Sequence, residues 1–322
     1  MEELTLKILE ITREIVPTII QFEGDSNKKR TTKKLVTKKT TEEIDNILKT
    51  CLDNKINIVN YKSEHYPQKL KQFTDAPALL FYQGDLGLLD KQTIGVVGSR
   101  QLDDYSTKLM QLTRFHHKVV ISGMAYGTDI LAHQLSLAQD IPCVAVLPNG
   151  LLDHVFYPKA HIKIKDQILE NKGLIISQFL PDFQSKKYAF IKRNNLITQL
   201  SDIIWVVKAG VKSGSFCTGR LALANKKQVY STIKDIFDQN YKGNLELIEL
   251  GAIPLTNLNL ITPLDKVYLK QDEQKIVNLI LSGINQFDLL LEEVEYIELV
   301  ESIMRMEAKN ILFNNQGEYQ VV

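Results

Sequence analysis

The sequence has few cysteines, no long apolar run and none of the short motifs that mark common nucleotide- or metal-dependent enzymes. Its three scattered cysteines form no Cys-x-x-Cys pair, which argues against a disulfide framework or a zinc knuckle and indicates a reducing cytoplasm. No apolar run approaches the ~18 residues of a membrane span. The chain begins Met-Glu-Glu without a basic region ahead of an apolar one, so we expect no signal peptide.

Enzyme signatures are missing as well. The sequence contains neither a Walker A loop nor a His-Glu-x-x-His motif, and its first glycine turn reads Gly95-x-x-Gly98 instead of Gly-x-Gly-x-x-Gly. A dinucleotide cofactor is therefore not expected. We predict a protein without a catalytic residue, a metal or a cofactor.

Charge is distributed unevenly along the 322 residues. The formal net charge is +1, but residues 266–322 carry five basic and ten acidic side chains, a net charge of −5, which leaves +6 for residues 1–265. Any polyanion site should lie in those first 265 residues. Residues 27–39 hold seven cations, but no aromatic residues interleave them, so a solvated segment is preferred to an auxiliary nucleic-acid contact.

The apolar patterns predict three regions. Residues 1–55 read as a helical N-terminal region, with apolar helical spacing over 4–22 and 42–57; residues 56–262 read as an α/β domain; residues 263–322 read as a small winged-helix-like domain of three helices and a hairpin. Short strands alternate with helices in the central region, which indicates a doubly wound, mostly parallel sheet. Its predicted strands are 93–98, 118–122, 143–147, 173–177, 203–207 and 228–232, and its predicted helices are 104–116, 128–139, 160–171, 190–200 and 215–225.

The stretch Thr-Ile-Gly-Val-Val-Gly-Ser-Arg at residues 93–100 has the layout of a first strand, a tight loop and a helix start. Gly98 permits close approach of backbone to a ligand, and free N–H groups at the helix start favour an anion. The planar guanidinium of Arg100 suits a phosphate. We interpret the loop as a phosphate-binding turn; the alternative is a plain strand–helix turn with a surface arginine.

Glycines, serines and cations recur where the other predicted strands end. The carboxyl ends of parallel strands meet at one edge of the sheet, where ligands bind. Three glycine-rich turns beside five cations suit a repeated polyanion better than a single nucleotide. The cations are Arg100, Lys159, Lys192, Arg193 and Lys212, and the small residues that permit close backbone approach are Gly98, Ser99, Gly123, Ser213 and Gly214.

In these residues the sequence resembles the DNA-processing protein A family, also called DprA or Smf. The resemblance extends from about residue 56 to about residue 252 and depends on the order and spacing of short motifs. These are Tyr66-Pro67, Gly98-Ser99-Arg100, Ser122-Gly123 through Gly127 with Asp129 and His133, Asn149-Gly150, Phe156-Tyr157-Pro158-Lys159-Ala160, Phe190 with Arg193-Asn194, Ser201, Ser213-Gly214-Ser215 with Thr218, Gly243-Asn244 and Gly251-Ala252.

The resemblance implies an extended Rossmann-like domain that binds single-stranded DNA, forms a homodimer and helps to load a RecA-type recombinase during uptake of transforming DNA. Phe190 is expected either to stack on a base or to be a core residue at a helix start. Together with the residues of the sheet edge, the family contacts give one predicted DNA-binding set: Gly98, Ser99, Arg100, Gly123, Lys159, Phe190, Lys192, Arg193, Asn194, Lys212, Ser213 and Gly214.

Three positions depart from the family pattern. Asn195 stands where the family usually has arginine, and Gln178 and Lys208 stand where it usually has glutamate. Relative to the family pattern, Gln178 and Lys208 remove two negative charges, Lys208 adds a positive charge, and Asn195 removes one. We therefore expect a more positive sheet edge and no carboxylate chemistry there.

Two other functions stay open. Related nucleotide phosphoribohydrolases use a catalytic glutamate in a glycine-rich loop, but residues 212–220 contain no acid, which makes hydrolysis a poor fit. A sensor of a small nucleotide could hold phosphates with Lys192 and Arg193, and a mononucleotide would saturate it. Asp129 and His133, four residues apart on one predicted helix, are interpreted as structural and not as an acid–base pair.

The predicted C-terminal helix carries Glu295, Glu298 and Glu301, with Arg305 as the nearby cation. Winged helices often place their last helix in the DNA major groove, but these carboxylates would repel phosphate. We therefore expect this domain not to grip DNA and instead to pack on another protein or on another domain.

Overall fold

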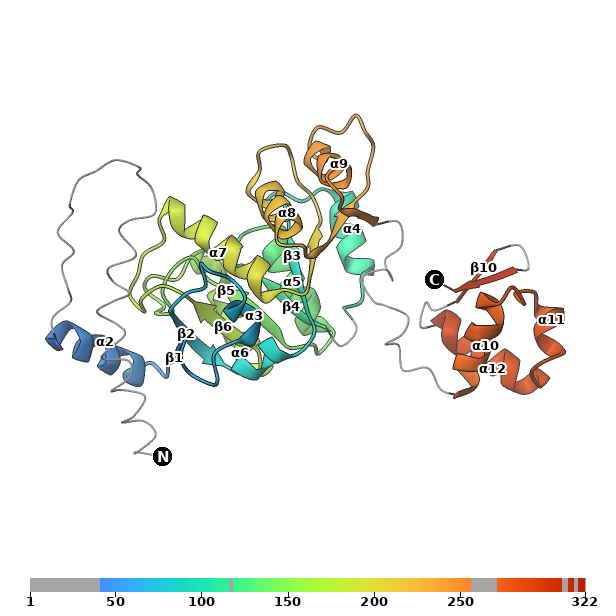
Figure 1. Ribbon diagram of the computed structural model, residues 1–322, viewed down its shortest axis with the longest axis horizontal. Helices are drawn as coiled ribbons and strands as arrows, with labels where there is room; N and C mark the ends of the chain where they lie inside the picture. The colour runs from blue at the N-terminus through green and yellow to red at the C-terminus, as the bar shows by residue number, and fades with distance from the viewer. Residues whose placement is uncertain (1–40, 116–117, 256–270, 309–311, 316–317, 322) are drawn as a thin grey trace. The chain divides into compact units, whose positions relative to one another are not determined.

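The computed structural model describes residues 41–115, 118–255, 271–308, 312–315 and 318–321 (Figure 1). The predicted helix at 4–22 and the basic segment at 27–39 lie outside these residues. The chain divides into two compact units: Met1–Gln111 with His117–Pro254, and Leu112–His116 with Leu255–Val322. The predicted boundary at residue 262 falls in a stretch that the structure does not describe, so it stays a proposal.

Unit 1 is built on one nine-stranded sheet with the strand order β1-β2-β6-β5-β4-β3-β7-β8-β9. Six central strands are parallel, and β1 and β2 extend the sheet in antiparallel fashion beside β6. This confirms the predicted Rossmann-like, mostly parallel α/β fold. The strands are β1 (Asn57–Asn60), β2 (Leu79–Gly84), β3 (Thr93–Val97), β4 (Val119–Ser122), β5 (Cys143–Val146), β6 (Leu174–Ser177), β7 (Ile203–Val206), β8 (Gln228–Thr232) and β9 (Ile253–Leu255).

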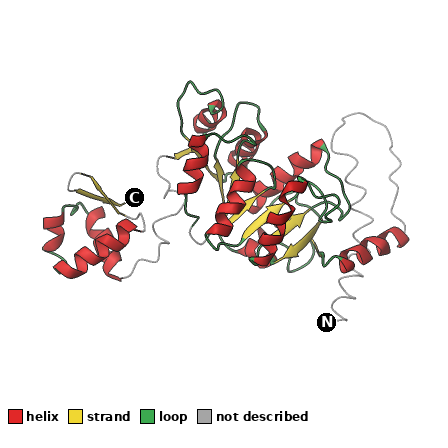
Figure 2. Cartoon of the chain, turned by 180° about the vertical axis from the view of Figure 1, so that it is seen from behind, coloured by secondary structure: helices red, strands yellow, loops and turns green. Residues whose placement is uncertain are grey.

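The central strands are short and β-branched, and every residue of β3 to β7 is buried. Such uninterrupted burial is typical of parallel strands that helices cover on both faces. Figure 2 shows helices on either side of the strands. Alternate side chains of the strands, such as Ile121 and Val144, join Leu196 and Phe216 in one apolar core, and the intervening residues point to the opposite face.

The helices of unit 1 fill the connections between strands. α7 packs against β3, β4 and β5, and α8 packs against β7 and β8, whereas α5 and α6 contact each other and cover β3 to β6. The helices are α2 (Thr41–Asp53), α3 (Gln68–Lys71), α4 (Asp104–Leu112), α5 (Thr128–Ala138), α6 (Ile162–Glu170), α7 (Lys187–Leu200), α8 (Gly214–Ala224) and α9 (Lys242–Glu249), with single 3-10 turns η1 (Leu86–Asp90) and η2 (Lys159–His161).

Strand β3 lies where the order of strand addition reverses: β4, β5 and β6 follow on one side of it, and β7 and β8 follow on the other. It pairs with β4 on one side and with β7 on the other, so that Ile94 lies opposite both Val120 and Ile203. In an open α/β sheet this reversal leaves a crevice at the carboxyl ends of the strands, where ligands bind. The fold therefore places the loops after β3 and β7 side by side.

Unit 2 contains α10 (Gln271–Leu281), α11 (Phe287–Leu291), α12 (Tyr296–Ala308) and a hairpin of β10 (Leu312–Asn315) and β11 (Glu318–Val321). It has its own core, which includes Ile276, Leu299, Ile303 and Met306. The three predicted helices and the hairpin are present; whether they act as a winged helix stays a prediction. No helix in the described parts of either unit has the length and apolar character that crossing a bilayer requires.

Candidate nucleic-acid interface

An open groove runs along the carboxyl ends of β3, β4 and β7, where the sheet reverses its strand order. It encloses about 950 Å³ of space, part of it open to solvent. Its walls come from the loop after β3, the start of α5, one face of α7, the loop after β7 and the start of α8. The residues that line it are Val97, Gly98, Ser99, Arg100, Ala125, Asp129, Phe190, Ile191, Arg193, Asn194, Lys208, Gly210, Ser213, Gly214, Ser215 and Thr218.

The loop at residues 98–100 is fixed against the start of α5. The Ser99 carbonyl accepts hydrogen bonds from the Thr128 amide and hydroxyl, both at 3.1 Å. A Cβ at Gly98 would lie 2.3 Å from the Thr128 hydroxyl oxygen, so only glycine permits this approach. The Arg100 side chain is exposed and faces the ring of Phe190, with the guanidinium carbon 5.5 Å from the ring centroid.

Arg193 is buried and paired, unlike Arg100. Its side chain is 5% exposed, and its Nη1 donates to Asp129 Oδ2 at 2.9 Å. The guanidinium lies against Gly123 so closely that a Cβ there would meet Nη1 at 1.2 Å. The Nε of Arg193 has no hydrogen-bond partner in the protein. This N–H group is buried as well as unpartnered, so the arginine is held mainly by its ion pair with Asp129.

His133 is in contact with the carbonyl of the same glycine. Its Nε2 lies 2.7 Å from the Gly123 carbonyl, and its Nδ1 lies 3.3 Å from Cys143 Sγ. The ring is fully buried, and burial lowers its pKa to about 4. A neutral imidazole that donates to a backbone carbonyl is the structural arrangement that the sequence indicated.

One face of α7 supplies three groove residues at helical spacing. Phe190, Arg193 and Asn194 stand at i, i+3 and i+4, which places them together on the helix surface. Phe190 is half-buried, and its ring meets that of Tyr157 edge to face with centroids 6.3 Å apart. It is therefore a wall of the groove and not a core residue.

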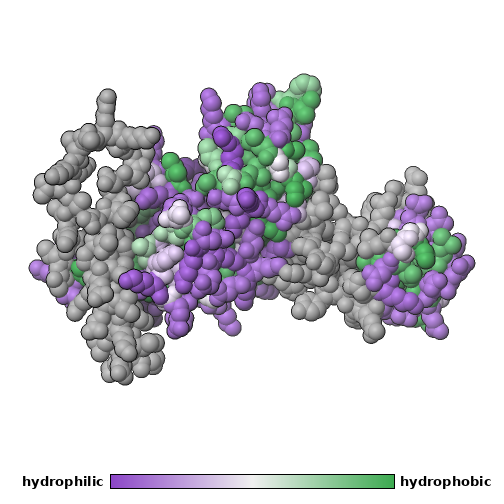
Figure 3. Space-filling model, in the orientation of Figure 1, coloured by the Kyte–Doolittle hydropathy of each residue, from purple (hydrophilic) through white to green (hydrophobic). Residues whose placement is uncertain are grey.

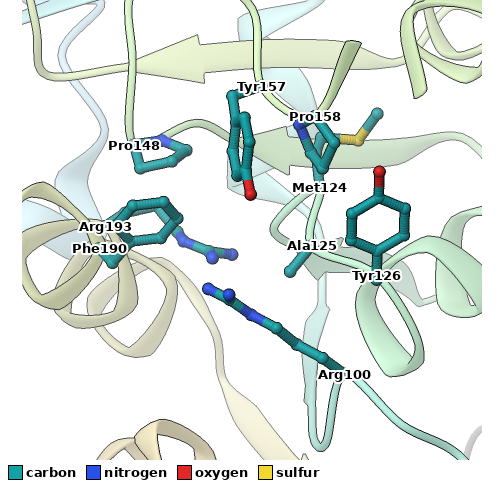
Figure 4. A pocket seen from close by; sticks show the side chains of 9 residues that line it. All are labelled: Arg100, Met124, Ala125, Tyr126, Pro148, Tyr157, Pro158, Phe190 and Arg193. Atoms are coloured by element: carbon teal, nitrogen blue, oxygen red, sulfur yellow. The ribbon is translucent and has the colours of Figure 1, made fainter. Parts of the chain in front are cut away.

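A smaller pocket opens beside Phe190 and encloses about 260 Å³ of space, part of it open to solvent (Figure 4). The guanidinium groups of Arg100 and Arg193 point toward its centre from different elements, and the Tyr157 ring lies across from them. Flat apolar and aromatic surfaces make up the rest of the wall: Met124, Ala125, Tyr126, Pro148 and Pro158. Two cations and several ring faces thus converge on one space.

The start of α8 forms the opposite wall. Ser213 caps this helix, because its hydroxyl accepts from the Phe216 amide at 3.1 Å. Gly214 and Ser215 form the first turn and line the groove. Amide groups in the first turn of a helix have no partner within the helix and carry partial positive charge, so this wall suits an anion.

Lys208 also lines the groove and is a residue whose role the sequence left open. It is buried, donates from Nζ to the Gln101 carbonyl at 3.0 Å, and lies 3.3 Å from Asp103 Oδ2. Burial alone would raise the pKa of Asp103, but hydrogen bonds from Ser106, Lys234 and Tyr241 outweigh it and lower that pKa. Lys208 is thus a paired cation at the groove floor.

The structure brings together most of the predicted DNA-binding set. Eight members line the groove, and Gly123 backs Arg193. Lys159, Lys192 and Lys212 are not among the side chains that line either space; their contact with DNA stays a prediction. The sequence did not single out Tyr126, Tyr157, Ile191 or Lys208 as contacts. Tyr157 could have been found, because it stands two residues before Lys159 in a motif already noted.

No three His, Cys, Asp or Glu side chains gather as a metal ion would require among the residues that the structure describes. Asp129 is the one carboxylate among the lining residues of these two spaces, and it is already paired with Arg193.

Comparison with known proteins places this architecture in a family. The Smf protein of Escherichia coli is 35% identical over 204 residues, which are 62% of this chain and 54% of Smf. DNA processing protein DprA of Streptococcus pneumoniae is 35% identical over 195 residues, 60% of this chain and 68% of that protein. The matched region therefore spans about half the length of Smf.

Two solved structures have the same fold. DprA from Streptococcus pneumoniae superposes with a TM-score of 0.61 at 31% identity, covering 69% of this chain and 80% of that one. DprA from Helicobacter pylori, whose structure concerns its single-stranded DNA binding mode, superposes with a TM-score of 0.58 at 29% identity, covering 66% and 96%. A family model described as DNA recombination-mediator protein A matches residues 57–264, more than half of the chain. The chain belongs to the DNA recombination-mediator protein A family, whose curated relatives are named DprA and Smf.

Proposed function

We propose that this protein binds single-stranded DNA in the groove at the carboxyl ends of β3, β4 and β7. The observation that carries the proposal is the convergence of an exposed guanidinium, an aromatic ring and a capped helix N-terminus on one groove. Cations and amides bind the phosphates, and rings stack on bases whatever their identity. The related Helicobacter pylori structure concerns single-stranded DNA binding, which supports the proposal.

The groove residues take different parts in this binding. Arg100 is exposed and free to neutralise a phosphate. Arg193 is already balanced by Asp129, so it holds the wall in shape without adding net charge. The amides of Gly214 and Ser215 receive a second phosphate. Phe190, with Tyr157 beside it, stacks on a base.

We propose further that the protein is not an enzyme and that sequence preference is low. The groove carboxylate is committed to an ion pair, and His133 is buried behind Gly123 and donates to its carbonyl. Both groups are structural in this arrangement. Backbone and ring contacts carry little base-edge information, so oligonucleotides of different sequence should bind alike.

The wider role follows the family. We propose that the protein protects incoming single strands and loads a RecA-type recombinase on them in the cytoplasm, during natural transformation or recombination. Support comes from the family description as a recombination mediator and from relatives named DNA processing protein. The free cysteines Cys51, Cys143 and Cys217 suit a reducing compartment.

We propose that the protein acts as a homodimer, joined through the loop between β8 and α9. Ile236 and Phe237 on this loop are 68% and 79% exposed. Figure 3 shows apolar side chains gathered over α9 and the loop before it. Exposed apolar patches on a soluble domain commonly mark protein contacts.

Anisotropy of a labelled thymidine oligonucleotide, measured across a salt series, tests the DNA-binding proposal. Wild type should bind with a negative log–log salt slope, and Arg100→Ala should weaken binding at least tenfold and reduce the slope by about 0.7, the value for one phosphate contact on a single strand. Arg220→Ala is the matched control, because Arg220 is exposed on α8 but does not line the groove. Equal loss in both variants would contradict the assignment.

A competition arm separates the DNA binder from a small-nucleotide sensor. Thymidine monophosphate at millimolar concentration should leave the oligonucleotide bound, because a polyanion site needs several linked phosphates. Complete displacement by the mononucleotide, with saturable binding of its own, would favour the sensor.

A further inference from the structure

Helix α12 has two apolar faces, and the core of unit 2 covers one of them. Leu299, Ile303 and Met306 are buried in that core. On the other face, Ile297 is 71% exposed and Met304 is 65% exposed, with half-buried Val300 between them. Positions 297, 300 and 304 are i, i+3 and i+7, so they form one stripe along the helix. This α12 stripe is an apolar surface that the folding of unit 2 does not explain.

The surroundings of the stripe are strongly acidic. Residues 271–308 contain nine acidic and two basic side chains, a net charge of −7. Glu295 and Glu298 are exposed next to the stripe. Both cations are engaged: Arg305 pairs with Asp272, Glu273 and Glu301, and Lys275 donates to the Glu293 carbonyl. The field over this face is therefore negative.

The charge decides what can cover the stripe. Nucleic acid and an anionic membrane would be repelled. A second copy of residues 271–308 would bring the same net charge of −7 against this one, and like charges facing each other disfavour docking. A protein surface with an apolar centre and lysines or arginines around it satisfies both the stripe and its acidic surroundings.

We propose that the α12 stripe is a docking surface for a basic amphipathic helix of another protein. Ile297 and Met304 are its apolar anchors; methionine adapts readily to the shape of a partner. Glu295 and Glu298 pair with the partner's cations and fix its orientation. The contact is separate from the DNA groove, so it stands whether or not DNA binds there.

The test uses the full chain and a fluorescent 18-residue peptide of leucine and lysine with helical apolar spacing. A scrambled peptide of the same composition is the comparison. Wild type should bind the amphipathic peptide saturably and at least tenfold more tightly than the scrambled one. Ile297→Ser with Met304→Ser should weaken binding tenfold or more, and Glu295→Gln with Glu298→Gln should weaken it and reduce its salt dependence.

Two controls keep the result interpretable. Leu52→Ser removes a side chain that is 61% exposed on α2 in unit 1, and Arg100→Ala disables the proposed DNA groove; both should bind the peptide as wild type does. Circular dichroism of each variant verifies folding. Equal affinity for the two peptides, unchanged affinity of the folded stripe variant, or a change in oligomeric state of the stripe variant would each overturn the proposal.

Discussion

At the scale of single residues, the shape of the groove depends on Arg193, an arginine whose side chain is almost fully buried. Arg193 is held between Asp129 and the bare α-carbon of Gly123. Breaking a buried ion pair by removing one partner costs roughly 3–5 kcal/mol, so the position of this guanidinium is tightly determined. Sequence alone counted Arg193 with the surface cations. Burial was not visible in the motif, because the neighbouring Lys192 and Asn194 read as equally polar.

The first prediction concerns Gly123. Gly123→Ala would place a Cβ 1.2 Å from Arg193 Nη1, so the guanidinium must leave its site and the groove wall must shift. We expect a loss of about 3–5 kcal/mol in the free energy of unfolding, because buried Asp129 loses its partner, and at least tenfold weaker oligonucleotide binding. Urea denaturation and anisotropy measure the two effects.

Gly210→Ala is the matched control for this change. Gly210 lines the same groove, but a Cβ there would find its nearest neighbour at 3.9 Å. It should fold and bind as wild type does. If both alanine variants bind DNA normally, Arg193 is not a determinant of the groove.

The second prediction concerns His133 and pH. Burial lowers its pKa to about 4, against about 6.5 in an unfolded chain. Between these values the unfolded chain binds a proton that the folded protein does not, so stability falls as pH drops from about 6.5 toward 4. The contribution is about 2 kcal/mol between pH 7 and pH 5.

Urea denaturation at pH 7 and pH 5 measures this contribution. His133→Gln should lose that part of the pH dependence, whatever its absolute stability. His65→Gln removes an imidazole whose side chain is 76% exposed and should keep it. If the free energy of unfolding of His133→Gln falls between pH 7 and pH 5 as much as that of wild type, the buried ring is not the group responsible.

At the scale of elements, the alternation of β-branched runs and amphipathic segments predicted the six central strands to within a residue at each end. Helix boundaries were less well predicted. The helix predicted at 104–116 ends at Leu112. Helix α7 begins at Lys187, three residues before the predicted start, because Lys187 and Tyr188 add no apolar periodicity that marks the boundary. Strand β9 was missed, since a three-residue edge strand has too few positions to show alternation. The sequence also could not show which side chains of α7 face the groove. Successive residues of a helix point 100° apart, so Ile191 lines the groove whereas the next residue, Lys192, does not.

The third prediction tests the first turn of α8. Ser213→Ala removes the cap on the Phe216 amide and should cost about 1 kcal/mol of stability. Ser213→Asn and Ser213→Asp both retain a capping oxygen, so both should keep near-native stability. They should differ in function: Asn should bind the oligonucleotide within a few-fold of wild type, whereas Asp places a negative charge where the phosphate is expected and should bind at least tenfold more weakly. Equal binding by these two variants would remove the α8 terminus from the site.

At the scale of the whole molecule, the exposed apolar residues Ile236 and Phe237 stand on a loop whose base is held in place by side-chain contacts. Lys234 lies over the rings of Tyr105 and Tyr241, 5.5 and 4.8 Å from their centroids, and pairs with Asp103 and Asp238. This network fixes the base of the loop. A fixed loop loses little conformational entropy on docking, which favours association.

The fourth prediction follows from that geometry. Wild type should sediment as a dimer at micromolar concentration, and Phe237→Glu should sediment as a monomer, because a charge buried at the centre of an interface without a partner costs several kcal/mol. Leu52→Glu makes the same kind of change at an exposed site on α2 and should remain dimeric.

The monomer should still bind a short oligonucleotide, since the groove lies within one chain. In the dimer, two grooves on one long strand act with a high effective concentration. Phe237→Glu should therefore lose more affinity for a long oligonucleotide than for a short one, and a uniform loss on both lengths would show that this loop supports the groove itself and not the dimer.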